Sequence, residues 1–234
     1  MNIQTPITAA DPDIGNHALP MVVVVGNPNA GKSALFNALT GARQKVGNYP
    51  GVTVERHAGR LVLPGDELVE LVDLPGTYSL TPSSPDERVT CDTLRGAQAG
   101  ERVPNALLIV IDASNLDNHL RFAIELIALG QPTVIALNMI DMARRDGLEL
   151  SAAALSAELG VPVIETVAVR RRGTDAIRAA LSTALIARSP RVARRAPGDD
   201  PARTARAIAV AAIVSETSST ARSAPNSRVT PRST

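Results

Sequence analysis

Gly26-Asn27-Pro28-Asn29-Ala30-Gly31-Lys32-Ser33 is the stretch of this chain from which the fold can be predicted. It follows the apolar run 21–25 and precedes the helix-forming residues 34–39. A strand, a glycine loop and a helix start in this order are typical of a phosphate-binding loop. A simple glycine turn can have the same letters by chance, but the strand and helix on either side favour the phosphate-binding loop.

Each part of this loop has a physical role in binding a nucleoside triphosphate. The two glycines let backbone N–H groups converge on the β-phosphate, and the following helix adds the positive end of its dipole. We expect Lys32 to reach the β- and γ-phosphates and the Ser33 hydroxyl to bind Mg²⁺. The contacts expected around the phosphates come from Gly26, Asn27, Pro28, Asn29, Ala30, Gly31, Lys32, Ser33 and Ala34.

The overall composition narrows the class of protein. The chain has 234 residues with 24 basic and 23 acidic side chains, so no global charge argues for nucleic acid or an anionic membrane as partner. Its single cysteine, Cys91, excludes an internal disulfide. No apolar run reaches the roughly 18 residues of a membrane span. Few aromatic residues are present, so the core must be aliphatic, as in a parallel sheet covered by helices.

Hydrophobic patterning predicts an α/β fold with a mostly parallel, six-stranded sheet and helices on both faces. The expected strands are 21–25, 54–63, 68–73, 106–112, 133–138 and 162–167, and further helices are expected at 116–129, 151–159 and 175–187. Ligands of such sheets bind at the carboxyl ends of the strands. The polar motifs of this chain follow those strand ends.

The chain is expected to divide into five segments. Residues 1–20 form an N-terminal extension, 21–187 a nucleotide-binding domain, 188–200 a linker, 201–214 a partial helical segment and 215–234 a disordered tail. The tail is rich in Ser, Thr, Arg and Pro and cannot bury enough apolar area to offset its ordering entropy.

Two further loops complete the expected phosphate and magnesium site. Asp73 ends a strand in Asp-Leu-Pro-Gly, the spacing in which the carboxylate supports Mg²⁺ through water and the N–H of Gly76 approaches the γ-phosphate. The loop 46–53 is rich in turn-forming residues and ends in Gly51-Val52-Thr53. Thr53 can bind Mg²⁺ by its hydroxyl and the γ-phosphate by its N–H, which makes this loop a candidate switch that a triphosphate orders.

The string Asn138-Met139-Ile140-Asp141 predicts the choice of base. A carboxylate at Asp141 can accept two hydrogen bonds from guanine N1–H and N2–H₂, groups that adenine lacks, so GTP is favoured over ATP. A final base-contact loop is expected at Ala168-Val169-Arg170, where the N–H of Val169 would meet guanine O6. The serine that usually braces such a loop is absent, which makes this the weakest element.

The strings G-N-P-N-A-G-K-S, V-G-N-Y-P-G-V-T-V-E, D-L-P-G-T-Y-S-L, S-P-D-E-R-V and A-L-N-M-I-D-M-A closely resemble the cytoplasmic G domain of the bacterial ferrous iron transport protein B (FeoB) family. The resemblance covers about residues 21–187 in unbroken order. It implies a Ras-like P-loop GTPase fold and a Mg²⁺-dependent GTPase that regulates Fe²⁺ uptake through a membrane permease domain. It also places the family at the cytoplasmic side of the bacterial inner membrane and leaves a homo-oligomer open.

The resemblance further implies that Asn29 helps to bind a K⁺ ion that accelerates hydrolysis. The catalytic set is then Asn29, Lys32, Thr53 and Gly76. Thr77 follows Gly76 where many GTPases have a water-orienting glutamine, so slow intrinsic turnover is expected. We also expect a truncation or a shifted reading frame after about Val214. His17, His57, His119 and Cys91 have no metal-ligand spacing, and no iron site is expected.

Two other functions remain open from the sequence. One is a ribosome- or RNA-associated GTPase, which shares the Asn-rich phosphate loop but needs a basic RNA-binding domain that is not visible here. The other is a nucleotide-binding module with negligible catalysis, given the weak loop at Ala168-Val169. It is also favoured because the family resemblance implies a helical regulatory region after the G domain, of which only residues 201–214 could form the beginning. GTP hydrolysis in K⁺ against Na⁺ separates the iron-transport GTPase from the second of these.

Overall fold

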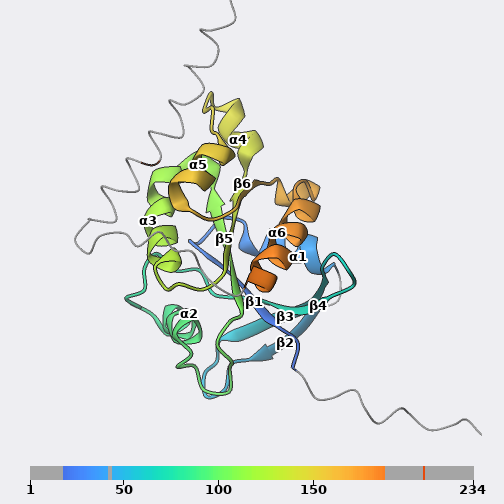
Figure 1. Cartoon of the computed structure of the whole chain (residues 1–234). Coiled ribbons are helices and arrows are strands. Elements are labelled where there is room, and N and C mark those ends of the chain that lie inside the picture. The colour runs from blue at the N-terminus through green and yellow to red at the C-terminus, as the bar shows by residue number, and fades with distance from the viewer. Residues whose placement is uncertain (1–17, 42–43, 188–207, 209–234) are drawn as a thin grey trace, which may run out of the picture.

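A seven-stranded sheet organises the protein, for which a computed structural model describes residues 18–41, 44–187 and 208. The strand order is β2-β3-β4-β1-β5-β6-β7, with helices on both faces (Figure 1). The strands are β1 (Met21–Gly26), β2 (Gln44–Asn48), β3 (Glu55–Val62), β4 (Leu68–Asp73), β5 (Ala106–Asp112), β6 (Thr133–Asn138) and β7 (Val163–Glu165). The helices are α1 (Lys32–Thr40), α2 (Pro85–Arg95), α3 (Leu116–Ile127), α4 (Ile140–Arg145), α5 (Ala152–Leu159) and α6 (Thr174–Ala187), with short 3₁₀ turns η1 (Ala113–Asn115) and η2 (Ala168–Arg170).

The sheet is mostly parallel, as predicted. Strand β1 lies between β4 and β5 and is parallel to both, and β6 and β7 continue the parallel part. Strand β3 pairs antiparallel with both β4 and β2. The fully buried aliphatic residues of β1 alternate between the two faces, because Met21, Val23 and Val25 pack in one core and Val22 and Val24 in the other.

The predicted number of six strands is wrong, because β2 was not predicted: it begins just before the predicted loop 46–53 and extends into it. Its residues from Lys45 to Asn48 are exposed, so it has no buried face to produce an apolar alternation. It forms through backbone pairing at the sheet edge, where Val46 lies opposite His57. The last strand is also shorter than expected, Val163–Glu165 in place of 162–167.

Two separate cores hold the helices on the sheet. Helices α1 and α6 cover one face with Leu35, Phe36 and Leu181 among the buried residues. Helices α2 to α5 cover the other, where Leu94 and Phe122 are buried. The two faces can be followed in Figure 1, with α1 and α6 on one side of the strands and α2 and α3 on the other.

Helix α2 is an element that the hydrophobic pattern does not predict, although its ends carry clear signals. Ser84 accepts a hydrogen bond from Glu87 N at 3.2 Å, and Pro85 occupies the first helical position. Gly96 ends the helix in the left-handed region. These caps set the bounds of α2, which is the next helix after the Asp73–Gly76 loop and is joined to it by residues 77–84.

The segments expected at 188–200 and 215–234 lie outside the described residues, as do residues 1–17 of the N-terminal extension. Within the expected helical segment 201–214, Ile208 alone is described, and it is helical and buried against the core that α2 to α5 cover. In the described part of the chain, no helix is both long enough and apolar enough to cross a membrane.

Candidate functional site

The loop between β1 and α1 has the curled backbone that its sequence predicts. Asn29 and Gly31 both adopt left-handed conformations, with φ of 64° and 87°. A Cβ on Gly31 would lie 2.3 Å from Nδ2 of Asn138, so this position has no room for a side chain. The curl leaves Asn29 exposed at the outside of the loop.

Lys32 is held across this loop. Its side chain is buried, and Nζ donates a hydrogen bond to the backbone oxygen of Asn27 at 2.9 Å. Burial lowers the pKa of Lys32, while the nearby charge of Asp73 acts in the opposite direction. An ammonium group in this position is already desolvated and lies where a phosphate can replace the carbonyl as its partner.

Ser33 and Asp73 meet at the ends of α1 and β4. The Ser33 hydroxyl donates to Asp73 Oδ2 at 2.8 Å, and Asp73 Oδ1 is buried with no hydrogen-bond partner. Burial raises the pKa of Asp73, and the bond from Ser33 and the charge of Lys32 oppose that rise. A buried, unpartnered carboxylate oxygen beside a hydroxyl fits a hard divalent cation such as Mg²⁺.

Gly76 approaches the loop closely from the other side. A Cβ added to it would lie 2.9 Å from Lys32 Nζ and 3.0 Å from the Cα of Pro28. The next residue, Thr77, is fully buried, and its hydroxyl donates to the Ser79 oxygen at 3.0 Å. Thr77 therefore points its hydroxyl into its own turn and not toward the loop.

A cavity of about 400 Å³ joins these groups to the candidate switch. It is lined by Lys32, Ser33, Asp73 and Gly76, and Thr53 and Asp86 contribute from the outer side. Thr53 is exposed, as are Gly51 and Val52. The structure therefore brings Lys32, Ser33, Asp73 and Gly76 together with Thr53 in one hollow.

Asn138 connects the phosphate loop with the last loop of the site. Its Nδ2 donates to the Ala30 oxygen at 3.0 Å, and its Oδ1 accepts from Ala168 N at 3.0 Å and from the Thr166 hydroxyl at 3.3 Å. Both ends of this buried side chain are thus used inside the protein. Thr166 was not predicted as part of the site. It lies two residues before Ala168, the position where a bracing serine is usual, and its hydroxyl binds Asn138.

The groups expected to contact the base lie farther out. Met139 adopts a left-handed conformation with φ of 58°, and α4 begins directly after it. The side chain of Asp141 is about one-third exposed, and its Oδ2 lies 3.8 Å from Arg170 Nη2. In η2, Ala168 is buried and Val169 is 82% exposed. The structure places Asp141 and Arg170 next to each other.

The sequence predicts no iron site at His57, His119 or Cys91, and all three lie among the described residues. No group of three or more His, Cys, Asp or Glu side chains that could hold a metal ion is found within 18–41 and 44–187. His119 is buried and accepts a hydrogen bond from Asp112 N at 3.2 Å, while Cys91 is buried in α2. His17 lies outside the described residues.

Comparison with known proteins decides the family. The family model described as "Ferrous iron transport protein B" matches residues 20–181. The chain belongs to the ferrous iron transport protein B family. Among curated members, the Fe(2+) transporter FeoB of Shigella flexneri is 47% identical over 162 residues, covering 68% of this chain and 20% of that protein. The corresponding transporter of Escherichia coli K12 is 46% identical over the same length. The chain thus spans about a fifth of the length of these relatives.

Solved structures of this family have the same fold. The cytosolic domain of FeoB from L. pneumophila has a TM-score of 0.65 and 40% identity, covering 74% of this chain and 70% of that one. An S. thermophilus NFeoB E67A mutant, solved bound to GDP, has a TM-score of 0.61 and 42% identity, with 68% and 59% covered. The T. maritima domain in its GMPPNP form has a TM-score of 0.66 and 32% identity, with 76% and 67% covered. The expected P-loop GTPase fold and its FeoB G-domain form are therefore confirmed.

Proposed function

We propose that this chain binds and hydrolyses GTP in a Mg²⁺-dependent manner and acts as the regulatory G domain of a ferrous iron transporter. The observation that carries the proposal is the pair Ser33 and Asp73, because one buried oxygen of the Asp73 carboxylate is left without a partner beside a hydroxyl and an ammonium group. Mg²⁺ usually binds in proteins through one or two carboxylates or hydroxyls together with substrate phosphates. Lys32 lies within the same cavity to neutralise those phosphates.

In this proposal the residues of the cavity divide the work. Ser33, Asp73 and Thr53 would hold Mg²⁺, which would neutralise phosphate charge when bound. Lys32 exchanges its bond to Asn27 for phosphate oxygens. The backbone N–H groups of the phosphate loop and of Gly76 donate to the phosphates, since no side chain stands between Gly76 and the loop.

Guanine selection rests on Asp141. Its carboxylate is accessible and lies beside the guanidinium of Arg170. Guanine N1–H and N2–H₂ can replace Arg170 as the partners of this carboxylate. Asn138 supports this end indirectly, because it ties the loop at Ala168 to the phosphate loop at Ala30. Val169 N–H and the apolar stem of Met139 complete the proposed contacts with the base.

In many GTPases a glutamine orients the water that attacks the γ-phosphate. Thr77 occupies that position with its hydroxyl engaged by Ser79, which supports slow intrinsic turnover. Asn29 is exposed on the outer side of the loop, where its side-chain oxygen is free to bind K⁺ together with a nucleotide. A cation there would neutralise charge that develops near the bridging oxygen.

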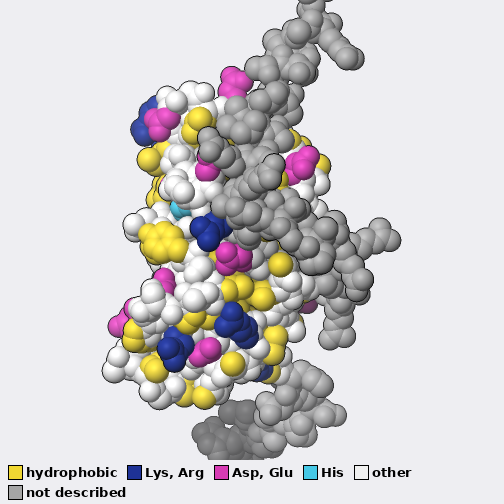
Figure 2. Space-filling view, turned by 90° about the vertical axis from the view of Figure 1, so that its left-hand side faces the viewer, with side chains coloured by type: hydrophobic (Ala, Val, Ile, Leu, Met, Phe, Trp, Pro, Cys, Tyr) yellow, Lys and Arg dark blue, Asp and Glu magenta, His cyan; other side chains and the backbone are white. Residues whose placement is uncertain are grey.

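The transport role is proposed from the relatives, which are named Fe(2+) transporters and of which the matched 162 residues make up 20%. Permeation is then assigned to a membrane permease partner. In the part of the molecular surface that Figure 2 shows, Lys and Arg side chains are scattered among Asp and Glu, and this gives no support to an RNA-associated role.

The test is a single-turnover assay of GTP and ATP hydrolysis with Mg²⁺, in KCl and in NaCl. We expect binding of GTP over ATP and faster hydrolysis in KCl, with the KCl effect lost in Asn29→Ala and kept in Asn118→Ala, an exposed asparagine on α3. Binding of GTP with no turnover in either salt would favour the nucleotide-binding module. Failure to bind guanine nucleotides would overturn the proposal.

A further inference from the structure

Tyr49 is buried in a segment whose neighbours are exposed. Residues 45–48 and 50–53 face solvent, whereas Tyr49 is only 1% exposed and packs in the core that α2 to α5 cover. Its hydroxyl has no hydrogen-bond partner, and burial, followed by the charge of Glu101, raises the pKa of Tyr49 above its ordinary range. A buried hydroxyl without a partner destabilises the conformation that contains it.

The same residue closes the candidate switch loop. Tyr49 N donates to the Val54 oxygen at 3.0 Å, and Val52 N donates to the Tyr49 oxygen at 3.2 Å. Residues 50–53 therefore form a small loop with its base at Tyr49 and Val54. Thr53 is inside that loop, so any movement of Thr53 toward the nucleotide must act on Tyr49.

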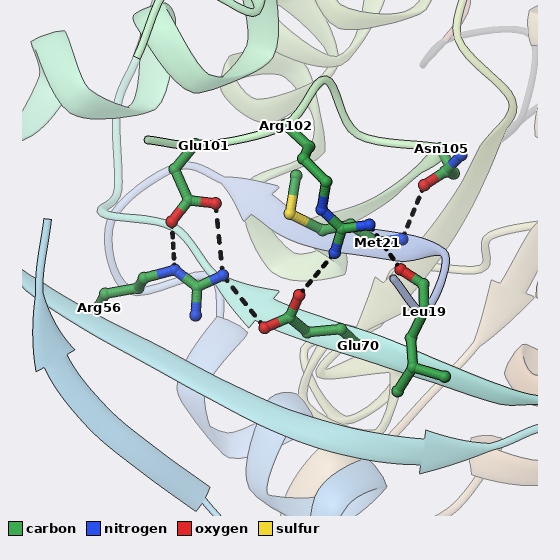
Figure 3. A network of polar contacts seen from close by, with 7 residues as sticks. All are labelled: Leu19, Met21, Arg56, Glu70, Glu101, Arg102 and Asn105. Atoms are coloured by element: carbon green, nitrogen blue, oxygen red, sulfur yellow. Dashed lines mark hydrogen bonds and ion pairs between the residues drawn. The ribbon is translucent and has the colours of Figure 1, made fainter. Parts of the chain in front are cut away.

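The base of the loop rests on the segment between α2 and β5. A Cβ on Gly100 would lie 2.9 Å from the Cγ of Pro50, which shows how close the two segments lie. Next to this contact, Arg56 pairs with Glu101 and, at 3.2 Å, with Glu70. Figure 3 shows this network, in which both carboxyl oxygens of Glu101 face the guanidinium of Arg56.

The network continues away from the switch. Glu70 also pairs with Arg102 at 3.0 Å, and Arg102 donates to the Leu19 oxygen at 2.8 Å (Figure 3). Arg102 thus belongs to the same cluster of charges without contacting the switch loop. Its position makes it a matched control for Glu101.

We propose that Tyr49 and the Arg56–Glu101 pair form a latch that holds loop 50–53 against the α2–β5 segment, and that a γ-phosphate opens it by drawing Thr53 to the nucleotide. This inference rests on the proposed function and makes Tyr49 and Glu101 positioning residues of the same site. Because Thr90 of α2 donates a hydrogen bond to the Pro75 oxygen at 2.8 Å, the α2–β5 segment that the latch holds is linked to the other loop that would contact the γ-phosphate.

The unpartnered hydroxyl of Tyr49 reduces the free-energy difference between the closed and the open latch. Burial of the ring and the Arg56 ion pair favour the closed latch, whereas the lone hydroxyl disfavours it and regains hydrogen bonds with water on release. A triphosphate that binds the open form more tightly shifts the equilibrium toward the open latch. A diphosphate does not, because it has no γ-phosphate to draw Thr53 to the nucleotide. The ratio of triphosphate to diphosphate affinity therefore measures the strength of the latch.

The first experiment measures that ratio with GDP and a non-hydrolysable GTP analogue. Tyr49→Phe removes the lone hydroxyl and strengthens the latch, so the relative affinity for the triphosphate falls about five-fold. Glu101→Gln weakens the ion pair, so the ratio rises about five-fold. Arg102→Gln leaves it unchanged. Shifts in the same direction for the first two variants, or an equal rise in Arg102→Gln, would overturn the latch.

The second experiment follows Tyr49 itself. The chain has two tyrosines, so 3-fluorotyrosine gives two ¹⁹F resonances, and Tyr78→Phe assigns them. We expect the triphosphate analogue, but not GDP, to move the Tyr49 signal toward that of a solvent-exposed tyrosine. A Tyr49 signal that is the same in both complexes would refute the latch while the proposed function stands. Binding of neither nucleotide would instead refute the proposed function.

Discussion

The inner part of the candidate site, around the phosphate loop, and its outer part, at the switch loop and the base end, differ in how many of their side chains are fixed by hydrogen bonds. In the inner part, Asn27, Lys32, Ser33, Asp73 and Asn138 are linked by hydrogen bonds to one another or to the loop backbone. In the outer part, Thr53, Asp141 and Arg170 are exposed or only partly buried. The inner part is thus preorganised for phosphate, which every nucleotide carries, while the outer part is free to respond to the γ-phosphate and the base.

The inner part should be the more sensitive to mutation. In Lys32→Ala the phosphates lose the one buried ammonium group of the cavity, so we expect affinity for GDP and GTP alike to fall about 100-fold or more. Isothermal titration calorimetry measures both. Lys45→Ala, an exposed lysine on β2, is the matched control and should bind as the wild type does. A loss confined to GTP would contradict the preorganised role.

The base end should respond by changing its preference. Asp141→Asn replaces an acceptor pair by a donor and an acceptor, which suits xanthine in place of guanine. We expect GTP affinity to fall about 10- to 100-fold, since hydrogen bonds to charged groups contribute about 1.5–3 kcal/mol, and xanthosine triphosphate affinity to rise. Competition against a fluorescent nucleotide gives both values, with Asp146→Asn on the next turn as control. Unchanged GTP affinity would remove Asp141 from the base site.

The switch loop should discriminate between nucleotides. Thr53→Ala removes a ligand that only the triphosphate complex uses, so we expect triphosphate affinity to fall about 5- to 30-fold and GDP affinity to stay the same. Stopped-flow dissociation of labelled GDP and a labelled GTP analogue measures the two. Thr81→Ala, an exposed threonine outside the cavity, should change neither. Equal losses for both nucleotides would mean that Thr53 does not report the γ-phosphate.

The same division explains what the sequence could predict. The inner part follows from local order, because a strand, a Gly-rich loop and a helix are adjacent in the chain and strand ends converge at one edge of the sheet. The brace from Thr166 to Asn138 and the Arg56–Glu101 pair were not predicted, because no motif in the sequence marks either pair. Strand β2 was missed for another reason, as its exposed residues produce no apolar pattern.

The smallest expected effect concerns the stability of the inner part. Because burial raises the Asp73 pKa, the folded protein binds this proton more tightly than the unfolded chain does. The charged carboxylate therefore lowers stability above its raised pKa, and this loss is recovered as pH falls toward the ordinary value of 3.8. At pH 7 without nucleotide, Asp73→Asn should increase the free energy of unfolding by about 1 kcal/mol, or raise Tm by about 2–4 °C. The gain should shrink in acid, and stabilisation by Mg²⁺ and GDP should be lost. Thermal unfolding with Glu158→Gln as the exposed control tests this, and a less stable Asp73→Asn protein would show that the carboxylate is held for folding and not for a cation.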